Sequence, residues 1–436
     1  MGLGTRKRNG DSPVAVVPDE PLPLADADDD RREAVTARLF DGVLRSARSH
    51  LLRAEQPLAA EVWASGLLAV WHGLPAGPGD EPGGGFIDAL IRHAQAVGTA
   101  EALATLLALA AVAPGRAAAE ARTAAAAIQG EGQRPGLAAP AWVGTVGTAV
   151  PTEAWIGSDV YGDQEIVILG FVHPGQAGGG ETESAHSICV LVDHNQGGAA
   201  KDAYPAAALV QTLARWRDAE GDGIGLRPVS LPEAAARLTD ALVATDFSEA
   251  AAAGRDRGLA DMRALLVSRL ATLPPAESTG VGELDHEGRE WLVAEFLGSP
   301  EAADLLSEPG VVDVCHSLIA YRCDYGDGDP LRWSPTLAGL CLLDHFPVKV
   351  SLEEPDLALV PPVLAAWVTF AGRRRGLSPA AVTRILDAID DCRPDFAVAM
   401  GDGSRWSPAK RAAMGVEPAG VELAMAVATA VPAARG

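Results

Sequence analysis

The side chains with the greatest chemical potential lie together, directly after an apolar run that ends at Val192. Asp193, His194, Lys201 and Asp202 are the candidate catalytic residues, and Asn195, Gly197 and Gly198 are the candidate ligand-binding residues. An aspartate can orient a neighbouring imidazole, which then serves as a general base near neutral pH. A lysine can hold an anionic group, and glycines let backbone amides approach a ligand closely. The spacing therefore predicts a small-molecule-binding or hydrolytic site.

The position of this cluster supports the same interpretation. Residues 187–192 are predicted to form a strand, so Asp193 would emerge at its carboxyl end, where open α/β sheets bind ligands. The alternative is an ordinary turn, in which Asp193 and Asn195 bond to their own backbone and His194 and Lys201 are solvated. The stretch matches no known nucleophile or phosphate-binding signature, and both interpretations stay open.

Two histidines near this cluster raise the possibility of a metal site, but their spacing matches no known metal-binding motif. His173 and His186 flank a glycine-rich loop and, together with His194 and Asp193, would suit zinc. Nothing in their spacing fixes a geometry, and a mobile surface loop is the favoured explanation of the pattern. We predict no metal and no cofactor.

Two further patterns depart from known metal motifs. Asp327 and Asp329 have the spacing of the first two calcium ligands of an EF-hand, but Leu331 stands where the third would be. Cys315 and Cys323 are separated by an apolar segment, which indicates a packed helix instead of a zinc site. An acidic turn and a helix are the predicted structures.

The run Arg373–Arg375, followed by a glycine and Ser378-Pro379, resembles half of a helix-turn-helix. The chain has 35 basic and 58 acidic residues, a net charge of −23, which repels nucleic-acid phosphates. Asp387, Asp390 and Asp391 lie in the same predicted helix. Nucleic acid is therefore an improbable partner, and the arginines are predicted to stabilise a helix C-terminus.

Composition indicates a folded protein of the cytoplasm. The 436 residues are 48% hydrophobic and 21% charged, as in globular domains, and alanine dominates the predicted helices. Five widely spaced cysteines suggest reduced thiols. The first residues precede no apolar segment of the kind found in signal peptides. The apolar run from Ala102 to Ala113 is too short to span a membrane, so no membrane association is expected.

Apolar periodicity divides the chain into four predicted regions. Residues 1–29 combine prolines with an aspartate run and are predicted to be a disordered tail. Residues 30–130 carry apolar residues at helical spacing, with Pro57 opening one helix. Residues 140–250 hold predicted strands near 165–171, 187–192 and 224–229, with helices beginning at Pro205 and Pro232. Residues 255–436 are again helical, and Ser378-Pro379 is a strong helix start.

These regions predict an α+β, mainly helical fold. A small mixed β-sheet with helices forms the middle of the chain, flanked by N- and C-terminal helical regions.

Three motifs resemble a family of proteins of high-GC Gram-positive bacteria. They are Val190-Leu-Val-Asp-His-Asn195 with the following Lys-Asp-Ala, Trp333-Ser-Pro335, and Leu342-Leu-Asp-His-Phe-Pro-Val-Lys349. The stretch Pro362–Ala371 fits the same pattern, and the resemblance covers roughly residues 140–400. It implies a shared fold. Because the family has no assigned activity, it implies no role for any residue.

Two classes of function follow. The first is a cytoplasmic interaction or adaptor protein that contacts a protein partner through a helical surface. The absence of a recognised catalytic motif and the alanine-rich helices favour it. The alternative is the small-molecule-binding or hydrolytic domain built on the cluster that begins at Asp193.

Overall fold

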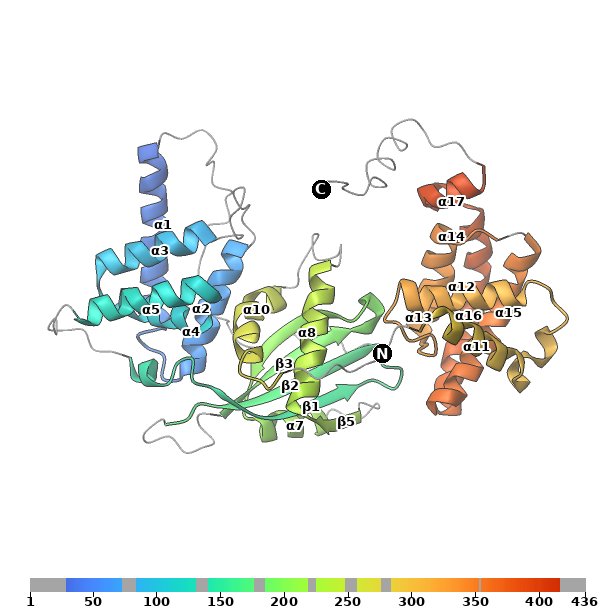
Figure 1. The fold of residues 1–436 in the computed structure, drawn as a ribbon, viewed down its shortest axis with the longest axis horizontal. Helices are drawn as coiled ribbons and strands as arrows, with labels where there is room; N and C mark the ends of the chain where they lie inside the picture. Colours follow the sequence, from blue (N-terminus) through green and yellow to red (C-terminus); the bar gives the residue numbers. More distant parts are fainter. Residues whose placement is uncertain are drawn as a thin grey trace. The chain divides into compact units, whose positions relative to one another are not determined.

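A computed structural model describes residues 29–72, 84–130, 140–175, 185–218, 225–247, 257–275, 284–352 and 354–415. These residues form an α+β, mainly helical fold with one small antiparallel sheet and helical regions on both sides of it in the sequence, as predicted (Figure 1). Contacts divide the chain into two units. The first comprises Met1–Gly157, Gln164–Val192 and Ala199–Thr279, and the second comprises Ser158–Asp163, Asp193–Gly198 and Gly280–Gly436.

The first unit begins with five helices. They are α1 (Asp29–His50), α2 (Pro57–His72), α3 (Gly84–Val97), α4 (Ala100–Val112) and α5 (Gly115–Gly130). Thr99 caps α4 by accepting a hydrogen bond from the Ala102 N–H, as side-chain oxygens at this position commonly do. The apolar run from Ala102 is a buried helix, not a membrane span, and its buried residues pack in the core of the unit. The predicted tail lies outside the described residues up to position 28.

The sheet contains β1 (Val150–Ser158), β2 (Gln164–Val172), β3 (Ala185–Asp193), β4 (Ala199–Ala206) and β5 (Gly225–Val229). Their order is β4-β3-β2-β1-β5, so the first four strands form a meander. The sheet is antiparallel, not mixed as predicted. The short connections from β1 to β2 and from β3 to β4 can join only antiparallel pairs, because parallel strands need a longer crossover. β5 returns to the edge beside β1 after the helix α7 (Leu209–Asp218).

Helices cover both faces of the sheet. Val167, Leu169 and Phe171 of β2 belong to the large core shared with α8 (Leu231–Phe247) and α10 (Arg257–Leu270). Ile166 and Ile168 point to the other face, where they pack with Leu213 of α7. This double burial explains the continuous apolar runs of β2 and β3. Gly170 allows α7 its close approach, since a Cβ there would lie 3.0 Å from Leu209 Cδ2.

One further prediction about the middle of the chain was wrong, and one strand was not predicted. The helix predicted to begin at Pro205 starts at Leu209, and residues 199–206 form strand β4. β1 was not predicted. The strand character of β4 depends on pairing with β3 and on Thr245 of α8, whose Oγ1 accepts from the Ala200 N–H at 2.9 Å. Because these contacts are distant in sequence, local propensity does not reveal them. The predicted boundaries near residues 130–140 and 250–255 lie largely outside the described residues.

The second unit is built from helices. They are α11 (His286–Leu297), α12 (Val311–Asp324), α13 (Pro335–Leu340), α14 (Phe346–Lys349), α15 (Glu354–Arg375), α16 (Pro379–Gly401) and α17 (Pro408–Ala413). A π-helical turn, Cys341–His345, connects α13 to α14. The predicted start of α16 is confirmed, since Ser378 Oγ accepts from the Ala381 N–H. Ile385 and Ile389 lie in the core of the unit, as their helical spacing predicted.

One helix of the second unit, α15, is long and apolar enough to cross a membrane by length and composition alone. Half of an apolar 18-residue window within Pro355–Arg375 is buried inside the structure. Val363, Leu364 and Trp367 are fully buried in the core of the unit. Since core helices of globular proteins pass the same test, this helix is weak support for a membrane span.

The five cysteines are free thiols, and burial predicts how they react. Burial raises the pKa of Cys189, despite a hydrogen bond with Tyr204, and that of Cys315, in each case to about 12. A three-unit rise lowers the thiolate fraction roughly a thousandfold. Native alkylation followed by peptide mass spectrometry is expected to label the half-buried Cys392 well before either. Equal labelling rates for Cys189 and Cys392 would contradict this expectation.

Candidate functional site

The stretch that begins at Asp193 forms a closed turn. β3 ends at Asp193, one residue after the predicted end at Val192, and the 3-10 turn His194–Gln196 follows directly. Asp193 Oδ1 accepts from the Asn195 N–H at 3.0 Å, and the Gly198 N–H donates to the Asp193 carbonyl at 3.1 Å. Gly197 and Gly198 have φ values of 70° and 78°, a left-handed conformation that strongly favours glycine. The Asp193 contact is the one that the turn interpretation predicts, whereas the Asn195 side chain bonds to Arg332 and not to its own backbone.

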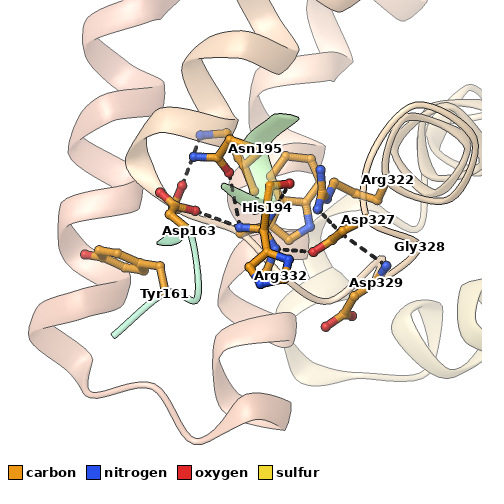
Figure 2. A network of polar contacts seen from close by, with 12 residues as sticks. Tyr161, Asp163, His194, Asn195, Arg322, Asp327, Gly328, Asp329 and Arg332 are labelled. Atoms are coloured by element: carbon orange, nitrogen blue, oxygen red, sulfur yellow. Dashed lines mark hydrogen bonds and ion pairs between the residues drawn. The ribbon is translucent and has the colours of Figure 1, made fainter. Parts of the chain in front are cut away.

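Arg332 is the centre of a polar network in the second unit (Figure 2). Its Nη2 donates to the His194 carbonyl at 2.9 Å. Its Nη1 donates to Asp163 Oδ1 at 2.7 Å and to Asn195 Oδ1 at 3.2 Å. The Asp163 carbonyl in turn accepts from the His194 N–H at 2.9 Å, so Arg332 fixes the two segments 158–163 and 193–198.

The other side of Arg332 contacts Asp327. Arg332 Nε donates to Asp327 Oδ2, while Asp327 Oδ1 accepts from Arg322 (Figure 2). Arg322 and Arg332 are 1% and 3% exposed. Two buried guanidinium groups thus share one carboxylate.

The acidic segment 324–329, which partly resembles a calcium loop, is an arginine-binding loop. Asp324 forms hydrogen bonds with Arg289, and Asp329 pairs with Arg375. With Asp327 already bound to two arginines, each of the three carboxylates has a cationic partner. This pairing agrees with the predicted acidic turn.

Tyr161 holds the segment 158–163 at a second place. Its hydroxyl donates to the Ala381 carbonyl at 3.2 Å and accepts from Arg384 Nε at 2.9 Å. Arg384 also lies over the Tyr161 ring, 5.7 Å from its centroid. The start of α16 therefore helps to position this segment.

Sequence reasoning missed Arg332 and Asp163, the two charged side chains that organise the network. They are separated by 169 residues in the sequence. The available signal was the position of Arg332 directly before the Trp333-Ser-Pro335 motif. Since its Nε, Nη1 and Nη2 all donate to protein oxygens, Arg332 is suited to holding the two segments together.

The structure brings some of the predicted site residues together and separates others. Asn195 and the backbone of His194 join the Arg332 network, and Asp193 caps their turn. Lys201 and Asp202 lie on β4, which belongs to the first unit. A ligand was predicted at the carboxyl end of β3 because open parallel sheets bind ligands there. Since this sheet is antiparallel, that reason no longer applies. The catalytic role of this cluster stays a prediction.

A second polar cluster is buried in the first unit. Glu61 of α2 pairs with Arg269 of α10, and its Oε1 lies 3.3 Å from His173 Nε2 and accepts from the Gly147 N–H at 2.8 Å. Arg269 lies 5.4 Å from the Phe171 ring centroid. The Glu61 and Arg269 side chains are 0% and 1% exposed. One carboxylate therefore links two helices to the end of β2.

This environment keeps Glu61 ionised. Burial by itself would raise its pKa, but the hydrogen bond with His173, the charges of Arg269 and His173 and the Gly147 N–H outweigh burial. Together they lower the pKa of Glu61 from 4.5 to about 2. A permanent charge in a buried position makes the cluster important for stability.

The suggested histidine site has no metal-binding geometry in the described part of the chain. The rings of His173 and His186 stack with their centroids 5.0 Å apart, and His186 also stacks on Phe171. Among the described residues, no three or more His, Cys, Asp or Glu side chains gather so as to hold a metal ion. His186 is therefore buried against aromatic rings, with 4% of the residue exposed.

The arginine run at the end of α15 pairs with carboxylates of its own unit. Arg373 donates to both oxygens of Glu301, Arg374 pairs with Glu295, and Arg375 pairs with Asp329. These ion pairs compete with any phosphate contact. The arginines were predicted to stabilise the C-terminus of their helix, and in the structure they also form specific ion pairs.

No family model, no curated protein and no solved structure matches this chain. The resemblance carried by the three sequence motifs gains no support from these comparisons, and the function must be argued from the chain itself.

Proposed function

We propose that this protein is a cytoplasmic interaction protein that binds a protein partner through the helical surface of its second unit. The observation that carries the proposal is Trp291 on α11, whose side chain is 61% exposed. On the same helix Leu292, Val293 and Phe296 are buried in the core. α11 therefore presents a large aromatic ring to solvent, and tryptophan is enriched among residues that dominate binding energies.

The charges around Trp291 indicate the kind of partner. Glu287, one helical turn earlier, is exposed, and so is Glu290 beside it. Glu290 also lies 3.0 Å from His316 Nε2. With a net charge of −23 for the whole chain, this surface favours a protein segment that carries an apolar side chain flanked by lysine or arginine.

The sheet offers little for strand addition, which supports a helical binding surface. At the β4 edge the Ala200 N–H is bonded to Thr245 of α8. At the β5 edge Pro228 has no N–H to donate. Both are devices that block pairing with a further strand.

The proposed location in the cytoplasm is supported by cysteine chemistry. All five cysteines are free, and Cys189, Cys315 and Cys341 are buried. Free thiols are typical of proteins from reducing compartments.

The Trp291→Ala variant is expected to lose the partner. Tagged full-length protein would be used to capture proteins from native cells, and the same captures would be made with Trp291→Ala and with Val398→Ala. Val398 is also an exposed apolar residue, 74% exposed on α16, so its variant is the matched control. We expect one protein to be captured by wild type and by Val398→Ala but not by Trp291→Ala.

The captured protein would then be purified and titrated with the three chains. Binding is expected to weaken at least about tenfold for Trp291→Ala, the range of a hot-spot residue, and to weaken with added salt. Equal affinity for all three chains, or capture sets that do not depend on Trp291, would reject the proposal.

A further inference from the structure

The π-helical turn Cys341–His345 has a local cause. Pro347 has no N–H to donate to the Leu343 carbonyl, four residues earlier, and Arg405 Nη2 donates to that carbonyl instead at 2.7 Å. The Phe346 N–H bonds to the Cys341 carbonyl, five residues earlier. Turns of this kind insert a residue into a helix and are frequent at functional sites.

The turn places His345 against Tyr321 of α12 and against Tyr325, the residue that directly follows α12. The imidazole centroid is 4.6 Å from the ring of Tyr321 and 4.9 Å from that of Tyr325. Tyr321 is buried, whereas Tyr325 is 59% exposed. His345 is half-buried, so the three rings form an aromatic surface that is open on the Tyr325 side.

Lys349 adds a positive charge to this surface. It lies one turn after His345 and is exposed, with its ammonium 5.7 Å from the Tyr325 ring centroid. Within the described residues it forms no ion pair. The nearby carboxylates have other partners, since Asp344 binds Arg405 and Asp324 binds Arg289.

His345 contributes neutral polar atoms. Burial, aided by the charge of Lys349, lowers its pKa to about 4, so the ring is uncharged near neutral pH. Neither ring nitrogen is hydrogen-bonded within the described part of the chain. A neutral imidazole offers one donor and one acceptor to a ligand.

We infer that Tyr325, His345 and Lys349 form a binding site for a small aromatic carboxylate. The carboxylate would contact the Lys349 ammonium and the His345 N–H, and the ligand ring would pack against the exposed Tyr325 ring. A single cation beside Asp324 and Asp344 suits a monoanion better than a doubly charged phosphate. This inference does not rest on the proposed protein-binding role.

The test is a titration of the full chain with benzoate, followed by calorimetry and ligand-observed NMR. Benzoate is expected to bind at least tenfold more tightly than neutral benzamide, acetate or inorganic phosphate. Acetate has the carboxylate but no ring, so its affinity compared with that of benzoate measures the contribution of the ring. Benzamide has the ring but no charge, so the same comparison measures the contribution of the charge. Stronger binding of phosphate than of benzoate would overturn the assignment of the ligand class.

Two variants locate the site. Lys349→Met and His345→Phe are each expected to weaken benzoate binding at least tenfold, and Lys349→Met changes an exposed side chain that the fold does not require. Arg116→Met, which removes an exposed cation of the first unit, is the matched control and is expected to bind benzoate like wild type. Equal affinities in wild type and Lys349→Met, or no binding at about 10 mM benzoate, would overturn the inference.

Discussion

Glutamine in place of Glu61 is expected to lower the free energy of unfolding of the first unit by about 3–5 kcal/mol, the usual cost of breaking a buried ion pair. The substitution keeps the size of the side chain but leaves the guanidinium of Arg269, 1% exposed, without its carboxylate. Urea denaturation of the full chain would measure the loss. Hydrogen exchange of α2 and α10 would show that it arises in the first unit.

Two variants separate charge burial from packing. Glu120→Gln removes an exposed partner of Arg116 and is expected to change stability by less than about 1 kcal/mol. Replacing both Glu61 and Arg269 with methionine is expected to recover most of the loss, since apolar replacements of buried pairs are often neutral. If Glu61→Gln costs no more than Glu120→Gln, the buried pair contributes little to stability.

The low pKa of Glu61 gives the same prediction a pH dependence. Because the folded-state pKa is about 2, below the ordinary 4.5, the ionised carboxylate stabilises the fold fully above pH 4.5. This contribution is lost as the pH falls towards 2. The stability difference between wild type and Glu61→Gln should therefore shrink with acidification over that interval.

Asparagine in place of Asp327 is expected to destabilise the second unit by a similar amount, about 3–5 kcal/mol. Asp327 is the shared partner of Arg322 and Arg332, so one substitution removes the negative charge next to two buried guanidinium groups. Hydrogen exchange should show the loss of protection in α12 and in the turn His194–Gln196, which Arg332 holds.

Asp390→Asn is the matched control for this change. Asp390 pairs with Arg393 on the exposed surface of α16, and both side chains are more than half exposed. Its substitution is expected to leave α12 protection unchanged. If Asp327→Asn also leaves α12 protected, the shared carboxylate is not required to hold the unit together.

Local chemistry made several elements predictable from the sequence. Ser378-Pro379 begins α16 because a hydroxyl cap and a proline at the first helical position suit a helix start in any context. The run before Asp193 forms β3 because apolar residues without a helical period pack on both faces of a sheet. The turn after β3 also follows from a local side chain, since Asp193 Oδ1 accepts from the Asn195 N–H.

The same residues show where prediction from sequence fails. β4 contains Asp202 and Pro205 and has little strand propensity, so its conformation depends on β3 and on Thr245. The sequence suggested ligand chemistry for Asn195, but the side chain binds Arg332, 137 residues away. An ion pair between distant residues produces no periodic pattern in the sequence. Because the chain has 58 acidic residues, each arginine has many possible partners, and the sequence does not show which one it binds.

The sequence by itself determined the mainly helical α+β class, the start of α16 and the strand that ends at Asp193. These features depend on caps, prolines and apolar spacing within a few residues of one another. Only the tertiary structure decided that Asp327 serves two buried arginines and that Glu61 joins α2 to α10. It also decided that a π-helical turn brings His345 and Lys349 beside Tyr325. Such contacts form only when segments that are distant in the sequence pack together and exclude water. A charge buried in this way needs an opposite charge beside it, and that partner can come from any part of the chain.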